Sequence, residues 1–283
     1  NMLYIYKPDG TQLSYAYFGN SGSYVASAVD LINLPATGTY TVFVDPYQAN
    51  VGQVSLQLLA DATGGLTADG SSMSATLSAG QNGDYTFSGT AGQRLGLGIG
   101  SLATTPAGGS VAVTVYGPTG TTLVSCGGYS APGNCNLPAL PAAGTYTVKV
   151  EPPNASAASL TLTLSNDVTG VLTVGGAAQT FSTARVGQNG RYTFSGTAGQ
   201  NLSLAWSGAT FPGSSNMLYI YKPDGTQLSY AYFGNSGSYV ASAVDLINLP
   251  ATGTYTVFVD PYQANVGQVS LQLLADATGG LTA

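Results

Sequence analysis

Histidine is absent from the sequence, which removes most of the side-chain chemistry that enzymes use at neutral pH. Ser-His-Asp and Cys-His nucleophilic arrangements, and every histidine-ligated metal site, require that residue. The two cysteines, Cys126 and Cys135, have eight residues between them, whereas a Cys-x-x-Cys redox site has two. We therefore expect no catalytic residues, no cofactor and no metal centre.

The aspartates are the remaining candidates for acid–base or metal chemistry. Asp9 lies in Pro-Asp-Gly, Asp45 precedes Pro46, and Asp61 and Asp167 begin Asp-x-Thr-Gly segments. These contexts are typical of turns, where the carboxylate bonds nearby backbone groups. No EF-hand loop of the Asp-x-Asp-x-Asp-Gly type is present. Turn formation is thus the first interpretation, and a calcium ion bound in a loop by scattered carboxylates and carbonyls is the alternative.

The segment between the two cysteines contains Gly, Pro and Asn, which allow its ends to meet. We predict a disulfide between Cys126 and Cys135 that stabilises the fold by roughly 2–3 kcal/mol. Two free buried thiols are the alternative. Because disulfides persist in oxidising compartments, this prediction favours a secreted protein at the cell surface or outside the cell.

The composition excludes several partner classes. Only 6% of the 283 residues are charged, and the net charge is −6. Six scattered Lys and Arg residues form no patch that could neutralise a run of phosphates, so we expect no nucleic-acid partner. No run of about 18 apolar residues occurs, so we expect no membrane insertion.

Internal repetition defines the organisation. Residues 1–68 recur letter for letter as residues 216–283, and the segment 80–93 returns in slightly changed form as 187–200. The repeat is therefore about 107 residues, the size of a sandwich domain. We predict three domains: a type-A repeat over 1–79 that lacks its N-terminal strands, a type-B repeat over 80–186, and a nearly complete type-A repeat over 187–283.

Within each repeat the hydrophobic period is 2, the period of a half-buried strand. Tyr146, Val148 and Val150, for example, alternate with polar residues. Turn signals separate the runs: Asn82-Gly83 predicts a type I′ hairpin, and residues 7–10, Lys-Pro-Asp-Gly, predict a further turn. The predicted fold is all-β: tandem antiparallel β-sandwich domains, jelly-roll-like, with about eight strands each.

Three motifs occur in a fixed order. They are Tyr-Thr-Phe-Ser-Gly-Thr-Ala-Gly-Gln, Leu-Tyr-Ile-Tyr-Lys-Pro-Asp-Gly-Thr and Ala-Thr-Gly-Thr-Tyr-Thr-Val-Phe-Val. This order resembles the bacterial pre-peptidase C-terminal domain family, a jelly-roll-like sandwich appended to secreted proteases and to large surface proteins. The resemblance covers residues 85–164 and 192–273, and part of it recurs over 3–58. The family usually has Asp before the Leu-Tyr strand, but this chain has Asn1 and Asn216, which puts a cation-binding role there in doubt.

Type A carries aromatic residues that type B lacks. By strand alternation Tyr4 and Phe43 point away from the core, where type B has Thr114 and Lys149. We predict a contact surface on the A units for a neighbouring subunit or for sugar rings, with burial under the domain's own loops as the alternative. Its candidate residues are Tyr4, Tyr15, Tyr17, Phe18, Tyr24, Phe43 and Tyr47, and their second copies Tyr219, Tyr230, Tyr232, Phe233, Tyr239, Phe258 and Tyr262.

The sequence favours a non-catalytic structural repeat array of a secreted bacterial surface or filament protein, in which copies or adjacent repeats contact one another. A glycan-binding adhesin module is the first alternative, and accessory domains of a secreted protease or toxin are another. For the incomplete first repeat we expect truncation of a continuous chain, with completion by a strand from another copy as the alternative.

Overall fold

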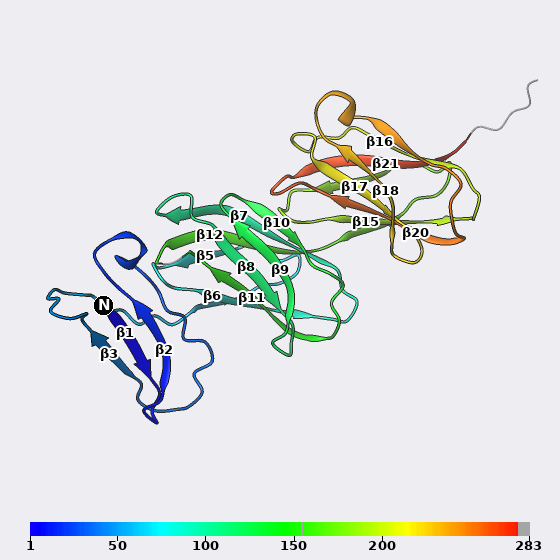
Figure 1. The fold of residues 1–283 in the computed structure, drawn as a ribbon. Helices are drawn as coiled ribbons and strands as arrows, with labels where there is room; N and C mark the ends of the chain where they lie inside the picture. The colour runs from blue at the N-terminus through cyan, green and yellow to red at the C-terminus, as the bar shows by residue number, and fades with distance from the viewer. Residues whose placement is uncertain (154, 277–283) are drawn as a thin grey trace, which may run out of the picture.

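The computed structural model describes residues 1–153 and 155–276, which form three β units that follow one another in a row (Figure 1). Nearly all the regular structure is β-strand, as predicted. The first A unit, residues 1–61, contains one sheet in the order β2-β1-β3. Its elements are β1 (Met2–Tyr6), β2 (Gln12–Tyr17), the 3-10 turn η1 (Gly22–Tyr24) and β3 (Thr41–Asp45).

The B unit, residues 62–167, is a complete sandwich of nine strands. A five-stranded sheet in the order β4-β6-β11-β8-β9 faces a four-stranded sheet in the order β10-β7-β12-β5. The strands are β4 (Ala62–Gly65), β5 (Met73–Leu77), β6 (Gly83–Gly89), β7 (Leu95–Thr105), β8 (Val111–Tyr116), β9 (Thr122–Tyr129), β10 (Gly133–Asn136), β11 (Gly144–Glu151) and β12 (Ala157–Asn166).

The second A unit, residues 168–276, repeats this topology strand for strand. Its sheets have the orders β13-β15-β20-β17-β18 and β14-β21-β16-β19. The elements are β13 (Val168–Val171), β14 (Gln179–Thr183), β15 (Gly190–Gly196), β16 (Leu202–Ser207), β17 (Asn216–Tyr221), β18 (Gln227–Phe233), the 3-10 turn η2 (Gly237–Tyr239), β19 (Ser242–Leu246), β20 (Gly253–Asp260) and β21 (Gly267–Ala275). Residues 277–283 of the predicted third domain lie outside the described residues.

Alternation along the strands forms one core in each complete unit. In the B unit Tyr146 is fully buried and stacks on Phe87 at a centroid distance of 5.1 Å, while its hydroxyl donates to the carbonyl of Ala142. The second A unit repeats this arrangement with Tyr255 and Phe194. Because each phenol hydroxyl has a partner, the two tyrosines can be buried without a desolvation penalty.

The unit boundaries differ from those predicted from the repeat. Residues 62–79, predicted to end the first repeat, contain β4 and β5, and Leu66 and Leu77 pack in the core of the B unit. In the same way residues 168–186 belong to the second A unit. A repeat reveals its length but not the position at which one unit ends, so each predicted boundary lies too far along the chain.

Two features of the predicted strand pattern also need correction. The predicted hairpin at Asn82-Gly83 does not form, because β5 and β6 lie in different sheets. Gly83 is required instead by packing, since a Cβ there would lie 2.6 Å from the ring of Tyr85. The pairing is antiparallel except for β4 with β6 and β13 with β15, which are parallel. The predicted turn over residues 7–10 is confirmed by the hydrogen bond from the Gly10 amide to the Lys7 carbonyl.

The first A unit has only part of its sandwich. Leu56 and Leu58 are 54% and 86% exposed and lie outside any strand, whereas their identical copies Leu271 and Leu273 are buried in β21. Residues 54–58, which alternate Val, Leu and Leu with polar residues, therefore form no strand in this unit. Its copy β21 pairs with β14 and β16, which come from a segment with no counterpart in the first A unit.

Candidate contact surface and unit junctions

The predicted disulfide is present between Cys126 on β9 and Cys135 on β10, with a Cα–Cα distance of 5.4 Å. These strands are the edges of the two different sheets, so the bond closes one side of the B sandwich. The second A unit has Ala231 and Val244 at the corresponding strand positions, and both pack against its core. Apolar contact thus replaces the covalent link in the A unit.

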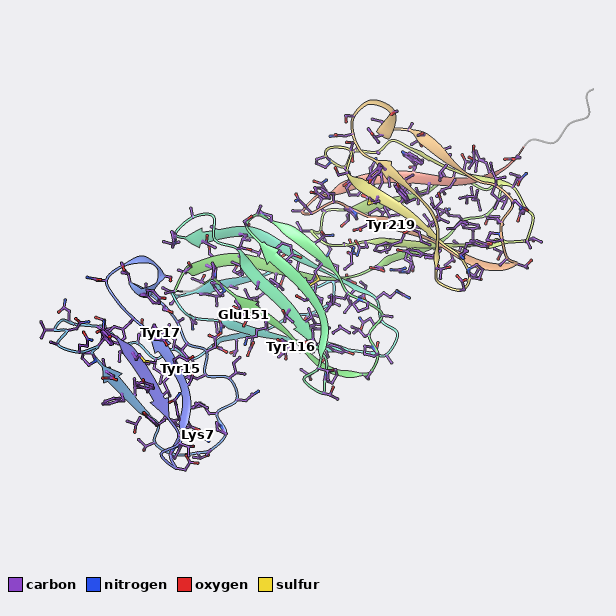
Figure 2. The ribbon with its side chains drawn as sticks, in the orientation of Figure 1. Lys7, Tyr15, Tyr17, Tyr116, Glu151 and Tyr219 are labelled. Atoms are coloured by element: carbon purple, nitrogen blue, oxygen red, sulfur yellow. A yellow bond between two sulfur atoms is a disulfide. The ribbon has the colours of Figure 1, made fainter. Side chains whose placement is uncertain are left out.

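An aromatic row crosses the outer face of the five-stranded sheet in the second A unit. Arg191 pairs with Phe258, Phe258 with Tyr219, and Tyr219 with Tyr230, across four neighbouring strands. The Arg191 guanidinium lies 4.5 Å from the Phe258 ring centroid, and the Phe258 and Tyr219 rings are stacked at 6.4 Å. Tyr230 and Tyr232 at the sheet edge are 52% and 44% exposed, so the row ends in open aromatic rings. Figure 2 labels Tyr219 within this face.

The first A unit carries the same aromatic face in more open form. Tyr4 stacks on Phe43 at 6.3 Å, and Tyr17 makes edge contacts with Tyr15 at 5.8 Å and with Tyr24 at 6.4 Å. Tyr15 and Tyr17 project from β2 (Figure 2), and both are about half exposed. Phe43 is 51% exposed whereas its copy in the second A unit is 7% exposed. The difference follows from strand position, since β3 is the edge of its sheet, whereas β20 is flanked by β15, which places Arg191 over Phe258.

The B unit presents a polar face at the same positions. Lys149 replaces the phenylalanine and pairs with Glu151 at 3.3 Å, while Thr114 replaces the tyrosine on the neighbouring strand. Tyr116, labelled in Figure 2, is the aromatic residue that B retains on this face, where it lies opposite Thr147. The aromatic face therefore alternates with a polar one along the chain.

Not every predicted residue lies on this face. Phe233 is fully buried and makes an edge contact with Phe211 at 5.4 Å, so it belongs to the core, and Phe18 is its counterpart in the first A unit. The reason is strand alternation, which turns Phe233 inward between outward-facing neighbours. Tyr239 lies in η2, where its carbonyl accepts the indole N–H of Trp206. Tyr47 and Tyr262 lie in loops that follow β3 and β20.

Asn216, where the family usually has Asp, is fully buried and fully hydrogen-bonded. Its Oδ1 accepts from the Tyr262 amide and from Asn265 Nδ2, and its Nδ2 donates to the carbonyls of Pro212 and Phe233. The side-chain amide thus ties the end of β18 to the loop of Pro212 and to the loop of Tyr262 and Asn265, and its hydrogen-bonding capacity is fully used, which leaves no free lone pair for a cation. Over residues 1–153 and 155–276 no group of three or more Asp, Glu or Cys side chains is placed to hold a metal ion.

The two unit junctions repeat the same hydrogen bonds. At the first junction Gln81 donates to the Ala60 carbonyl and Asn82 donates to the Asp30 carboxylate. At the second junction Gln188 donates to the Asn166 carbonyl and Asn189 Nδ2 donates to Asn136 Oδ1 at 2.8 Å. At both, the residues that connect the units form a parallel strand of the following sandwich, β4 or β13. The connections are therefore sheet structure and not flexible linkers.

The second junction has additional contacts. Arg185 donates to the Ser165 hydroxyl and to the Leu164 carbonyl, and Arg191 pairs with the buried Asp167 at 2.9 Å. On the outer face of β7, Gly98 allows the loop before β15 to approach the B backbone, since a Cβ there would lie 2.1 Å from the Val186 carbonyl oxygen. The alternation of leucine and glycine in β7 thus provides a core face and a docking face.

Comparison with known proteins agrees with the fold. Residues 81–152 and 188–261 match the model of the bacterial pre-peptidase C-terminal domain. The chain belongs to this family. Domains of the family are accessory domains that occur in secreted proteases. No match was found among curated proteins. In the described part of the chain no helix is long and apolar enough to cross a membrane.

Two similar solved structures are a domain of a collagenase and a secreted serine protease. The pre-peptidase C-terminal domain of a Bacillus anthracis collagenase is 15% identical, with a TM-score of 0.26, over 38% of this chain and 95% of that one. The secreted serine protease VesC from Vibrio cholerae is 10% identical, with a TM-score of 0.29, over 75% of this chain. The matched region is 48% of the VesC chain, about half its length.

Proposed function

We propose that the chain is part of a rigid, non-catalytic spacer array in a secreted or surface-attached bacterial protein, in a filament or stalk. The observation that carries this proposal is the repeated junction, in which the connecting residues pair as β4 or β13 with the sandwich that follows. Because each connection is hydrogen-bonded within a sheet, neighbouring units keep a fixed relation and the array holds its length.

The aromatic face of the A units is the proposed contact site with neighbouring copies. It presents Tyr230 and Tyr232 on an edge strand, and the low charge content of the chain limits electrostatic repulsion between arrays. The alternation with the polar B face would limit contact to one site in every two units. Tyrosine suits such a surface because its ring supplies a large contact area, and its hydroxyl can hydrogen-bond both when the surface is exposed to water and when it contacts another copy.

Sedimentation velocity over a range of protein concentrations tests this contact. We expect association that increases with concentration and that is lost when the edge tyrosines of both A units are replaced, in the variant Tyr15→Ser/Tyr17→Ser/Tyr230→Ser/Tyr232→Ser. The matched control is Thr114→Ser in the B unit, at the position of Tyr219, which should associate like the unchanged chain. A monomer at every concentration would contradict self-contact and leave the array as a passive spacer.

A glycan-binding adhesin is the second candidate, because exposed tyrosine rings also stack on sugar rings. Tyr15 and Tyr17, at an interplanar angle of 90°, form an open aromatic edge of the kind that such a site needs. Binding of neutral glycans by a chain that remains monomeric would favour this candidate. The third candidate, accessory domains of a secreted protease or toxin, is supported by the family alone.

A further inference from the structure

A cleft of about 720 Å³ lies between the B unit and the second A unit. One wall is the end of the B sandwich, with Arg94 and Pro138, and the other is the outer sheet face of the A unit, with Tyr221, Lys222 and Thr254. This volume lies within the range of small-molecule sites. The aromatic row described above forms part of the A wall through Phe258.

The cleft collects positive charge in an acidic chain. Of the six Lys and Arg residues, Arg94, Arg191 and Lys222 line it, and Asp167 is the one lining carboxylate. Arg191 is held by that buried carboxylate, and Lys222 reaches the exposed Asp224 at 3.6 Å. Arg94 has no side-chain hydrogen bond or ion pair within the described residues. Burial and then the adjacent Arg191 lower the pKa of the Arg94 guanidinium, and the Asp167 carboxylate offsets only part of that shift.

The first junction has no equivalent site. Asp84 stands where the second junction has Arg191, Lys149 where it has Phe258, and Gly117 where it has Lys222. The charge and the aromatic wall are therefore specific to the step from B to A, and the structural role shared by both junctions does not require them.

We propose that this cleft binds the carboxylate of an acidic saccharide. Arg94 and Lys222 would hold the carboxylate, the Tyr221 ring would pack on the apolar face of a sugar ring, and Thr254 and Thr256 would exchange hydrogen bonds with sugar hydroxyls. An extended peptide fits less well, since peptides bind at the open backbone of an edge strand. The A wall consists of β15, β20 and β17, each of which is paired on both sides.

Isothermal titration of the 283-residue chain with α-1,4-linked trigalacturonate tests the proposal. We expect binding that weakens as salt is added, and a loss of affinity of about tenfold in Arg94→Ala and in Lys222→Ala. Lys7→Ala is the matched control, because Lys7 has the same sequence context and the same aspartate neighbour as Lys222 but does not line the cleft. It should bind like the unchanged chain.

Two further probes separate the ligand classes. The neutral methyl ester of the trisaccharide should bind at least tenfold more weakly, since the ester cannot pair with Arg94. Triglutamate should also bind more weakly, because it has no sugar ring for Tyr221. Absence of trigalacturonate binding, an equal loss in Lys7→Ala and Lys222→Ala, or tighter binding of triglutamate would each overturn the proposal. Thermal unfolding of each variant checks that the fold is retained, and both target side chains lie outside the cores.

Discussion

Replacing Gly98 with valine tests whether the junction between the B unit and the second A unit stabilises the second A unit. Its Cβ would lie 2.1 Å from the Val186 carbonyl oxygen, about 1.4 Å inside normal contact. The loop before β15 must then move away from β7, and the hydrogen bonds of Arg185, Gln188 and Asn189 to the B unit would stretch or break.

Overpacking of this kind costs roughly 1–3 kcal/mol. If the junction stabilises the second A unit, that loss lowers its unfolding midpoint by roughly 5–15 °C, given a domain of this size. The assay is fluorescence of Trp206, the single tryptophan, which is buried in the core of the second A unit and reports on that unit alone. The mutation therefore lies in one unit and the signal in another.

The matched control is Ala205→Val, at the equivalent position on β16, where the outer face is not covered by a following unit among the described residues. Ala205→Val should shift the unfolding midpoint by no more than a few degrees, because valine is favoured in strands and its side chain would face outward here. An unchanged Trp206 midpoint in Gly98→Val, or an equal shift in Ala205→Val, would refute the reasoning that the junction couples the units.

Three further perturbations test other parts of the structure. Replacing Cys126 and Cys135 with serine should destabilise the B unit by roughly 2.5 kcal/mol, from the closed loop of ten residues, with calorimetry as the measurement; an unchanged B transition would contradict it. Arg191→Ala removes the ion-pair partner of the buried Asp167 carboxylate and should cost roughly 3 kcal/mol, and Asp167→Ala in the same chain should restore much of that loss. Burial raises the pKa of the Asp260 carboxyl above its ordinary value of 3.8. Between pH 3.8 and the raised pKa the native state therefore binds more protons than the unfolded state, so the free energy of unfolding falls as the pH rises through this range. Asp260→Asn should therefore stabilise the second A unit at pH 7, and its advantage should disappear as the pH approaches 3.8; an advantage that persists there would contradict the assignment.

Much of the fold follows from local patterns in the sequence. The alternation around Tyr146 and in Leu160, Leu162 and Leu164 predicts β11 and β12, and the Gly and Pro turns predict where strands end. The cysteine spacing predicts the disulfide, because a short loop of turn-forming residues brings the two sulfurs together. The family resemblance, carried by the same aromatic and turn motifs, is confirmed over both complete units.

The positions of the boundaries between units, and the roles of some residues, could not be predicted from local sequence patterns. A perfectly repeated sequence can be divided at any point, and the assignment of residues 62–79 depends on β4 pairing in parallel with a strand of the next unit. The Asn-Gly pair predicts a turn at Gly83, yet the absence of a side chain at Gly83 instead allows packing against Tyr85. Phe233 follows a tyrosine-rich segment, and only its place in β18 turns it inward.

The cationic cleft also could not be predicted from the sequence. Arg94, Arg191 and Lys222 are isolated charges in the sequence, and no local motif marks them. They meet because the docking of β7 against the loop before β15 brings the end of the B sandwich over the outer sheet of the A unit. A surface created by the junction between repeats can be found only once that junction is known.

The distance distribution between the B unit and the second A unit tests the central claim of a rigid array most directly. Spin labels on cysteines introduced at Thr76 and Gln179, exposed positions of equivalent strands, report this distance by double electron–electron resonance. A rigid array should give one narrow peak in dilute solution, unchanged by salt and broadened in Gly98→Val. A broad distribution in the unchanged chain would show that the units move independently, and a flexible tether would then replace the rigid spacer.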